Sequence, residues 1–411
     1  MIDRTHDPEL RSWVESANRE DTDFPIQNLP IATFRKPGSD RGRAGVAIGD
    51  QVLDISSAFG IASLREYMAS HKSERTALRR AVSDFLTKKQ PGAEYLLTPM
   101  DSVALQLPCS IGGYTDFYAS IYHATNIGSM FRPENPLLPN YKWVPVAYNG
   151  RASTVAVSGT PVRRPLGQVS ASPVGPPVCK ATERLDYEAE IGAFLGPGNR
   201  MGETIPAAEA GDHIVGLCLL NDWSARDIQT WEYQPLGPFL AKSFATSISP
   251  WIVTAEALAP FRCELDPRPA GDPEPLPHLV GRRDEAYHVA IEVWLRSARM
   301  REPVRLSSGR FESMYWTLAQ MVTHHASNGC AMQPGDLIGS GTVSGPEKHN
   351  RGCLLELAWR GTEPVELPNG ETRGFLSDGD EVILRGRCDA PGFRSIGFGE
   401  CRGVVQPAIS R

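Results

Sequence analysis

The sequence lacks several patterns that mark specialised classes of protein. No apolar run approaches the ~18 residues that a membrane-spanning helix needs, and the polar start MIDRTHDPEL has no apolar core of a signal peptide. The formal net charge is −6, without the basic excess of a general nucleic-acid binder. These absences predict a soluble, cytoplasmic protein that binds neither membrane nor nucleic acid.

Paired cysteines and nucleotide motifs are also missing. The eight cysteines are scattered and form no CxxC pair, which favours reduced thiols over a disulfide framework or a zinc site. The glycine-rich segment 334–345 lacks the GxxxxGK[ST] spacing of a phosphate-binding loop, so no nucleotide cofactor is predicted. Because no G-x-S-x-G elbow occurs either, activated water is a simpler expectation than a covalent nucleophile.

Glycine and proline are abundant, at 38 and 34 residues, and they separate many short alternating runs. This pattern favours a mainly β fold with some helix, in the α+β class. A chain of 411 residues has room for a small domain beside a large one, and we expect the boundary near residue 110, giving domains 1–110 and 111–411. In the first we expect strands at 31–35, 43–50 and 51–55, a Gly49-Asp50 turn and a helical segment over 63–86.

The stretch YTDFYASIYHATNIGSMFR, residues 114–132, concentrates chemically useful side chains. Asp116 is predicted to cap a helix, and if that helix runs on, His123 lies about two turns later on the same face. A carboxylate and an imidazole on one face are typical of a metal ligand beside a general base. The alternative is a helix cap followed by a core histidine.

Three further carboxylates follow in strand-like segments. Glu188 and Glu190 are separated by one residue in an alternating run, so a strand places both on one face. Their mutual repulsion favours a neutralising divalent cation, although a solvent-facing sheet edge is the alternative. Asp222 ends an apolar strand. At this position it either belongs to a functional site or caps the next helix.

Together with Asp116 these residues form an all-oxygen set, and hard oxygen ligands select Ca²⁺ or Mg²⁺. His123 is the natural general base because its unperturbed pKa lies near neutrality. Glu356, in CLLELAW, is an acid in an otherwise apolar predicted strand and is expected to orient a histidine.

Many strings of the chain, in order over residues 110–405, resemble the fumarylacetoacetase (fumarylacetoacetate hydrolase) family, and the N-terminal third fits more loosely. The resemblance implies a small SH3-like barrel before a large β-roll or mixed β-sandwich. The segments on which the resemblance rests are YTDFYASIYHATNIGSMFR, LLPN, GRAS, SGTPVRRPLGQ, LDYEAEIGAFLGPGNR, NDWSARDIQTWEYQPLGPFLAKSF, THHASNGC, GSGTVSGPE and DGDEV.

The resemblance also implies a role for each matched residue. The metal carboxylates of the family match Asp116, Glu188, Glu190 and Asp222. The water-activating base matches His123, and its orienting carboxylate matches Glu356. The groups around the developing anion match Arg226, Gln229 and Lys242. The substrate contacts match Tyr118, Arg132, Tyr148, Gln229, Tyr233 and Thr342. Positions near a second, structural cation match Lys242 and Thr246.

The implied reaction is hydrolysis of a carbon–carbon bond in a β-diketo acid, giving fumarate and acetoacetate at the end of tyrosine and phenylalanine (homogentisate) breakdown. Family members pair as homodimers, which we also expect here. Two rival functions remain: a related acylpyruvate hydrolase or decarboxylase, and an inactive metal-binding scaffold. The loop after Arg132 and an exposed insertion at 262–284 depart from the family pattern and leave the substrate's side-chain preference open.

Overall fold

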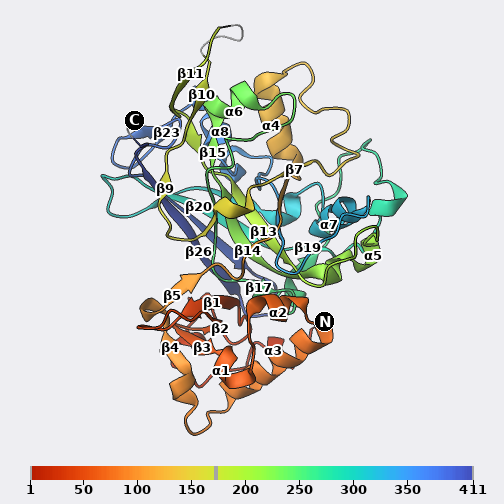
Figure 1. Cartoon of the computed structure of the whole chain (residues 1–411), viewed down its shortest axis with the longest axis vertical. Helices are drawn as coiled ribbons and strands as arrows, with labels where there is room; N and C mark the ends of the chain where they lie inside the picture. Colours follow the sequence, from red (N-terminus) through yellow and green to blue (C-terminus); the bar gives the residue numbers. More distant parts are fainter. Residues whose placement is uncertain (1, 171–174, 410–411) are drawn as a thin grey trace.

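The computed structural model describes residues 2–170 and 175–409 (Figure 1). Its N-terminal part, in red and orange, is an antiparallel sheet of order β4-β3-β2-β1-β5 with helices along one side. The predicted strands and the Gly49-Asp50 turn are confirmed, and Gly49 has the positive φ of +57° that such a turn favours. The elements are β1 (Ile31–Arg35), β2 (Arg43–Ile48), β3 (Gln51–Asp54), α1 (Ile55–Phe59), α2 (Leu64–Ala69), α3 (Lys72–Thr87), β4 (Leu97–Pro99) and β5 (Ala104–Gln106).

The large unit is built on a mixed central sheet of order β7-β6-β22-β13-β14-β16-β8, with β17 paired to β14. β6 runs parallel to β22 and β8 parallel to β16, while the other pairs are antiparallel. β13 and β14 are buried along their whole length, so both faces of the sheet are covered. The strands are β6 (Tyr114–Phe117), β7 (Ala147–Asn149), β8 (Val155–Val157), β13 (Ala189–Leu195), β14 (Ile214–Asp222), β16 (Thr246–Ile248), β17 (Val253–Thr254) and β22 (Leu337–Gly339).

A second sheet, of order β21-β20-β25-β26-β9, packs against the central one. β20 alternates between buried and more exposed residues, and its buried residues Ile291, Val293 and Leu295 share a core with Leu217 and Leu219 of β14. The predicted α+β class and the large β-sandwich are therefore confirmed. The strands are β9 (Val162–Arg163), β20 (Ala290–Arg296), β21 (Val304–Arg310), β25 (Glu381–Cys388) and β26 (Ile396–Gln406).

Short hairpins and helices surround these sheets. No helix among the described residues is long and apolar enough to cross a membrane. The remaining elements are α4 (Ile121–Phe131), β10 (Leu166–Val169), β11 (Val178–Ala181), β12 (Leu185–Asp186), α5 (Ala207–Ala210), β15 (Ser224–Ala225), α6 (Arg226–Glu232), β18 (Arg262–Cys263), β19 (Ala286–Tyr287), α7 (Leu318–Ala326), α8 (Leu354–Leu357), β23 (Val365–Glu366) and β24 (Thr372–Arg373).

The N-terminal unit packs directly on the central sheet. Ile31 of β1 and Ile48 of β2 belong to the same apolar cluster as Phe194 of β13 and Val215 of β14. Ile31 also forms a backbone bridge with Ile252. The two units therefore share buried apolar surface, which stabilises their arrangement. The boundary at residue 110 stays a prediction.

Candidate active site

Four carboxylates converge at one end of the central sheet. Asp116 lies on β6 opposite Gly339 of β22, and Asp222 is the last residue of β14. Glu190 is the second residue of β13, and Glu188 immediately precedes that strand. One oxygen from each of the four lies within 4.8 Å of the others, and all four residues are buried. The sheet thus gathers every carboxylate of the predicted set.

The local structure predicted around Asp116 is wrong. Asp116 does not cap a helix, because residues 114–117 pair as a strand with β22 on one side and β7 on the other. Helix α4 begins later and is capped by Ser120, whose hydroxyl accepts a hydrogen bond from the His123 backbone N–H. Asp116 therefore lies on a strand and His123 lies on the helix that follows it, and the two are not separated by two turns of one helix.

Buried oxygen atoms within the cluster have no protein partner. Among the described residues, Asp116 Oδ1 and Glu190 Oε1 accept no hydrogen bond. A Cβ atom at Gly339 would lie 2.5 Å from Asp116 Oδ1 and 3.0 Å from Glu190 Oε2, so only glycine leaves this space open. Unpaired buried carboxylate oxygens are costly, and a divalent cation is the group that this donor set fits.

Two cations partly balance the cluster. Lys242 Nζ lies 2.5 Å from Glu188 Oε2 and 3.0 Å from Asp222 Oδ2. Arg226 Nη1 lies 2.6 Å from Glu188 Oε1, and its Nη2 lies 2.8 Å from Asp186 Oδ2. Since both cations are buried, Glu188 is held as an anion between them.

The pKa values of the carboxylates diverge accordingly. Burial and then the negative charge of Asp222 raise the pKa of Asp116, while burial and then Asp116 raise the pKa of Glu190. Burial also opposes ionisation of Glu188, but the charges of Lys242 and Arg226 outweigh it and hold its pKa well below the usual range. Among the described residues, no lysine or arginine forms an ion pair with Asp116 or Glu190, because Lys242 and Arg226 pair with the other carboxylates. A bound cation would therefore act on the Asp116 and Glu190 side.

Tyr148 and Thr246 both fix Asp222. The Tyr148 hydroxyl donates to Asp222 Oδ2 at 2.6 Å, and the Thr246 hydroxyl donates to Asp222 Oδ1 at 2.8 Å. Asp222 does not cap α6, whose N-cap residue is Ala225. Of the two alternatives for Asp222, the structure thus favours membership of the cluster.

His123 and Glu356 form a buried pair beside the cluster. His123 Nδ1 lies 2.6 Å from Glu356 Oε2, and the two side chains are 4% and 0% exposed. The predicted strand for Glu356 is wrong, because 354–357 form the short helix α8. Burial raises the pKa of Glu356, but the charge and hydrogen bond of His123 outweigh this and hold that pKa below its usual value.

Sequence reasoning missed several residues that support this pair and the cluster. Asn126 Nδ2 donates to Glu356 Oε1 at 2.8 Å, Ser344 Oγ donates to Oε2 at 2.8 Å, and Cys353 Sγ lies 3.2 Å from Oε2. Asp186 holds Arg226 and was also missed, although its alternation with Glu188 and Glu190 in LDYEAE was a usable signal.

The predicted substrate contacts divide into two groups. The Tyr118 ring stands edge-on to His123 with 5.3 Å between centroids, and Gln229 Oε1 accepts from Arg226 Nη1 at 3.2 Å. Thr342 is buried, and its hydroxyl is without a partner in the described part of the chain. The side chains of Arg132 and Tyr233 are exposed and, among the described residues, make no hydrogen bond or ion pair with the other predicted site residues; they stay predictions.

Comparison with known proteins gives a consistent match along the chain. A family model described as fumarylacetoacetate (FAA) hydrolase C-terminal matches residues 113–406, and one described as fumarylacetoacetase N-terminal matches residues 27–108. Fumarylacetoacetases of Bos taurus and Homo sapiens are each 48% identical, covering 95% of this chain and 98% of their own. The fumarylacetoacetase of Arabidopsis thaliana is 42% identical, covering 97% and 99%.

Solved structures share the fold at lower identity. A maleylpyruvate hydrolase from Sphingobium sp. SYK-6 is 18% identical with a TM-score of 0.52, covering 92% of this chain and 100% of its own. A fumarylacetoacetate hydrolase from Exiguobacterium antarcticum is also 18% identical with a TM-score of 0.52, covering 92% and 99%. At this identity the likeness supports the fold alone.

Proposed function

Because the chain belongs to the fumarylacetoacetate hydrolase family, we propose that it hydrolyses 4-fumarylacetoacetate to fumarate and acetoacetate. Such an enzyme acts on a carbon–carbon bond of a β-diketo acid, in the last step of tyrosine and phenylalanine breakdown. The observation that carries the proposal is one buried pair, His123 and Glu356, next to four converging carboxylates. An inactive scaffold would have no need to keep both the base and the cation site.

His123 is the general base in this proposal. Its Nδ1 faces the Glu356 carboxylate, so with the proton on Nδ1 the other ring nitrogen, Nε2, is a free acceptor. Nε2 takes a proton from water, and the hydroxide formed attacks the carbonyl carbon next to the fumaryl part. Glu356 stabilises the imidazolium through the charge-assisted hydrogen bond.

The carbon–carbon bond then breaks and leaves its electron pair on the acetoacetate carbon as an enolate. Lys242, Arg226 and Gln229 are the proposed groups around this negative charge, and the first two are buried cations whose attraction is little weakened by water. The imidazolium of His123 returns its proton to that carbon, and the products are the two carboxylic acids. Tyr118, Arg132, Tyr148, Tyr233 and Thr342 are the proposed substrate contacts.

Asp116, Glu188, Glu190 and Asp222 are the proposed ligands of a divalent cation. When bound there, the cation would supply Lewis-acid polarisation of the substrate's diketone oxygens. All-oxygen ligands favour Ca²⁺ or Mg²⁺, and Lys242 and Thr246 are proposed to lie near a second, structural cation. We further propose that the protein is a cytoplasmic homodimer, as the sequence resemblance implies.

The test is the loss of fumarylacetoacetate absorbance on adding purified protein with Mg²⁺ or Ca²⁺. Turnover to fumarate and acetoacetate, lost after chelation and in His123→Ala, is the expected result. His349→Ala is the matched control, because this histidine is exposed and lies outside the cluster. Folded, metal-loaded protein that leaves fumarylacetoacetate intact but hydrolyses acylpyruvates would contradict the proposal and support the rival hydrolase.

A further inference from the structure

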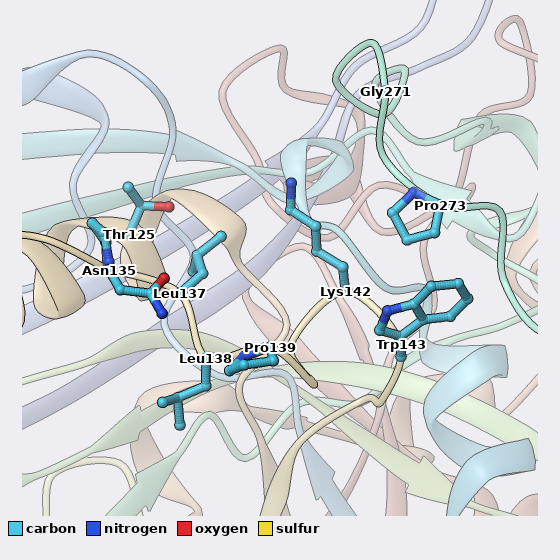
Figure 2. A pocket seen from close by; sticks show the side chains of 10 residues that line it. Thr125, Asn135, Leu137, Leu138, Pro139, Lys142, Trp143, Gly271 and Pro273 are labelled. Atoms are coloured by element: carbon cyan, nitrogen blue, oxygen red, sulfur yellow. The ribbon is translucent and has the colours of Figure 1, made fainter.

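The insertion predicted at 262–284 is mostly exposed, and its part 264–278 is here called the insertion. Besides the contacts of Asp266 with Glu312 and Arg310, two fastenings connect it to the loop after α4 and to the aromatic residues beside that loop. Its residues Gly271 and Pro273 form one wall of a cavity of about 610 Å³, and the loop after α4 forms the facing wall (Figure 2). That loop, residues 133–143 and here called the substrate loop, begins directly after Arg132, one of the proposed substrate contacts. The insertion and the substrate loop therefore meet across one cavity.

The first fastening is an ion pair between Lys142 of the loop and Asp272 of the insertion. The Asp272 side chain is only 5% exposed and that of Lys142 is 34% exposed, so water screens the pair poorly. Asp272 Oδ2 has no hydrogen-bond partner among the described residues. Removing the lysine would leave a nearly buried carboxylate uncompensated, which is strongly unfavourable.

The second fastening is Arg268, whose guanidinium carbon lies 4.2 Å from the ring centroid of Tyr315 and 4.6 Å from that of Trp316. Arg268 Nη1 also donates to Pro273 O at 2.9 Å and to the Tyr315 hydroxyl at 3.1 Å. One side chain thus closes the insertion on itself and attaches it to an aromatic pair in the core. A lysine would keep the charge but lose the planar stacking.

Tyr315 begins a series of aromatic ring contacts that ends at His123, the proposed base. Ring centroids are 6.0 Å apart between Tyr315 and Tyr141, 6.0 Å between Tyr141 and Tyr118, and 5.3 Å between Tyr118 and His123. The Tyr141 hydroxyl also donates to Tyr118 O at 2.9 Å. Tyr141 is the neighbour of Lys142, so both fastenings act on the same part of the substrate loop.

We propose that Arg268 and Asp272 are positioning residues that set how tightly the outer part of the substrate is held. Asp272 holds the substrate loop closed through Lys142, and Arg268 holds Tyr118 against His123 through Tyr315 and Tyr141. The inference rests on the proposed function, and it assigns side-chain preference to the insertion. Loosening the contact of Asp272 or that of Arg268 enlarges the cavity between the insertion and the substrate loop. The larger cavity weakens fumarylacetoacetate binding and admits β-diketo acids with bulkier ends.

The test combines hydrogen exchange with kinetics on Asp272→Asn. We expect faster amide exchange in residues 133–143, a rise in KM of about tenfold, and a change in kcat of less than about threefold. Asp266→Asn is the matched control, since Asp266 lies in the same insertion but pairs with Arg310 on the surface, with side chains 45% and 59% exposed. Combining Asp272→Asn with Lys142→Met should give a smaller effect than the sum of the two single substitutions.

Arg268→Lys and Arg268→Met test the second fastening, and both should raise KM and broaden the range of accepted diketo acids. Unchanged amide hydrogen exchange in residues 133–143 of Asp272→Asn would overturn the positioning proposal, whichever substrate the enzyme uses. The positioning proposal can therefore fail while the proposed function stands. Faster exchange with unchanged KM and substrate range would overturn the positioning proposal as well. If wild type does not hydrolyse fumarylacetoacetate but the exchange difference is present, the proposed function fails while the loop contact stands.

Discussion

His123 Nδ1 lies 2.6 Å from Glu356 Oε2, and both side chains are almost fully buried. Asn126 and Ser344 donate to the same carboxylate, and the Cys353 thiol contacts it. A carboxylate with this many donors is fixed in place and kept ionised. It selects the tautomer in which His123 carries its proton on Nδ1, which leaves Nε2 available to water.

Replacing Glu356 with glutamine should therefore impair catalysis more than binding. An amide carries no negative charge to stabilise the imidazolium, and it can present a donor to Nδ1, which favours the wrong tautomer. We expect kcat to fall by about 10²-fold or more, within the range typical of general-base catalysis, with KM changed by less than about threefold. Steady-state kinetics with fumarylacetoacetate measures both. Ser344→Ala removes one donor and keeps the carboxylate, so its kcat should fall by only about tenfold; equal losses in the two variants would contradict the assignment.

The same carboxylate predicts a pH-dependent stability difference. His123 and the other donors hold the pKa of Glu356 below its usual value, so the folded state binds its proton less readily than the unfolded state. The resulting stabilisation is fully present above the unfolded pKa, about 4.3, and is lost as the pH falls through the lower folded value. The difference in unfolding free energy between wild type and Glu356→Gln should therefore be larger at about pH 5 than below about pH 4. Urea unfolding across this range measures it, and a difference that widens on acidification would contradict the assignment.

Alternation along a strand was a better guide to the site residues than local helix-cap signals were. The i, i+2 spacing of Glu188 and Glu190 predicted that both side chains share one face, and the structure brings both into the cluster. Asp116 was misplaced because its segment is a strand only through pairing with β22 and β7, which lie far away in the sequence. Ser120, three residues before His123, carried the true cap signal.

Glu356 shows a second limit. The apolar run around it is too short for periodicity to distinguish a strand from a buried helical turn, and the structure forms α8 there. Its role as the partner of His123 depends on a contact between residues 233 positions apart, which only the tertiary structure or a family resemblance supplies. The same applies to Asn126, which is 230 positions from Glu356, whereas Cys353 lies only three residues before Glu356 and contacts it at the start of α8.

Among the described residues, Asp116 and Glu190 lie close together with unpaired buried oxygens and form no ion pair with a lysine or arginine. Their charges therefore repel whenever the divalent ion is absent. Asp116→Asn removes that repulsion together with one ligand. We expect metal-free Asp116→Asn to unfold at a higher temperature than metal-free wild type at pH 7.5, while its affinity for Ca²⁺ or Mg²⁺ falls by more than about 100-fold, beyond the loss typical of residues that only support ligands. Thermal unfolding with chelator and calorimetric titration with each ion measure the two effects separately.

Asp336→Asn is the control, since Asp336 accepts hydrogen bonds from the backbone N–H groups of Gly113 and Gln333 away from the cluster. This substitution should lower the stability of the protein with or without metal and leave the metal affinity unchanged. If Asp116→Asn instead lowers the unfolding temperature of metal-free protein and binds Ca²⁺ and Mg²⁺ like wild type, the four carboxylates do not form a cation site.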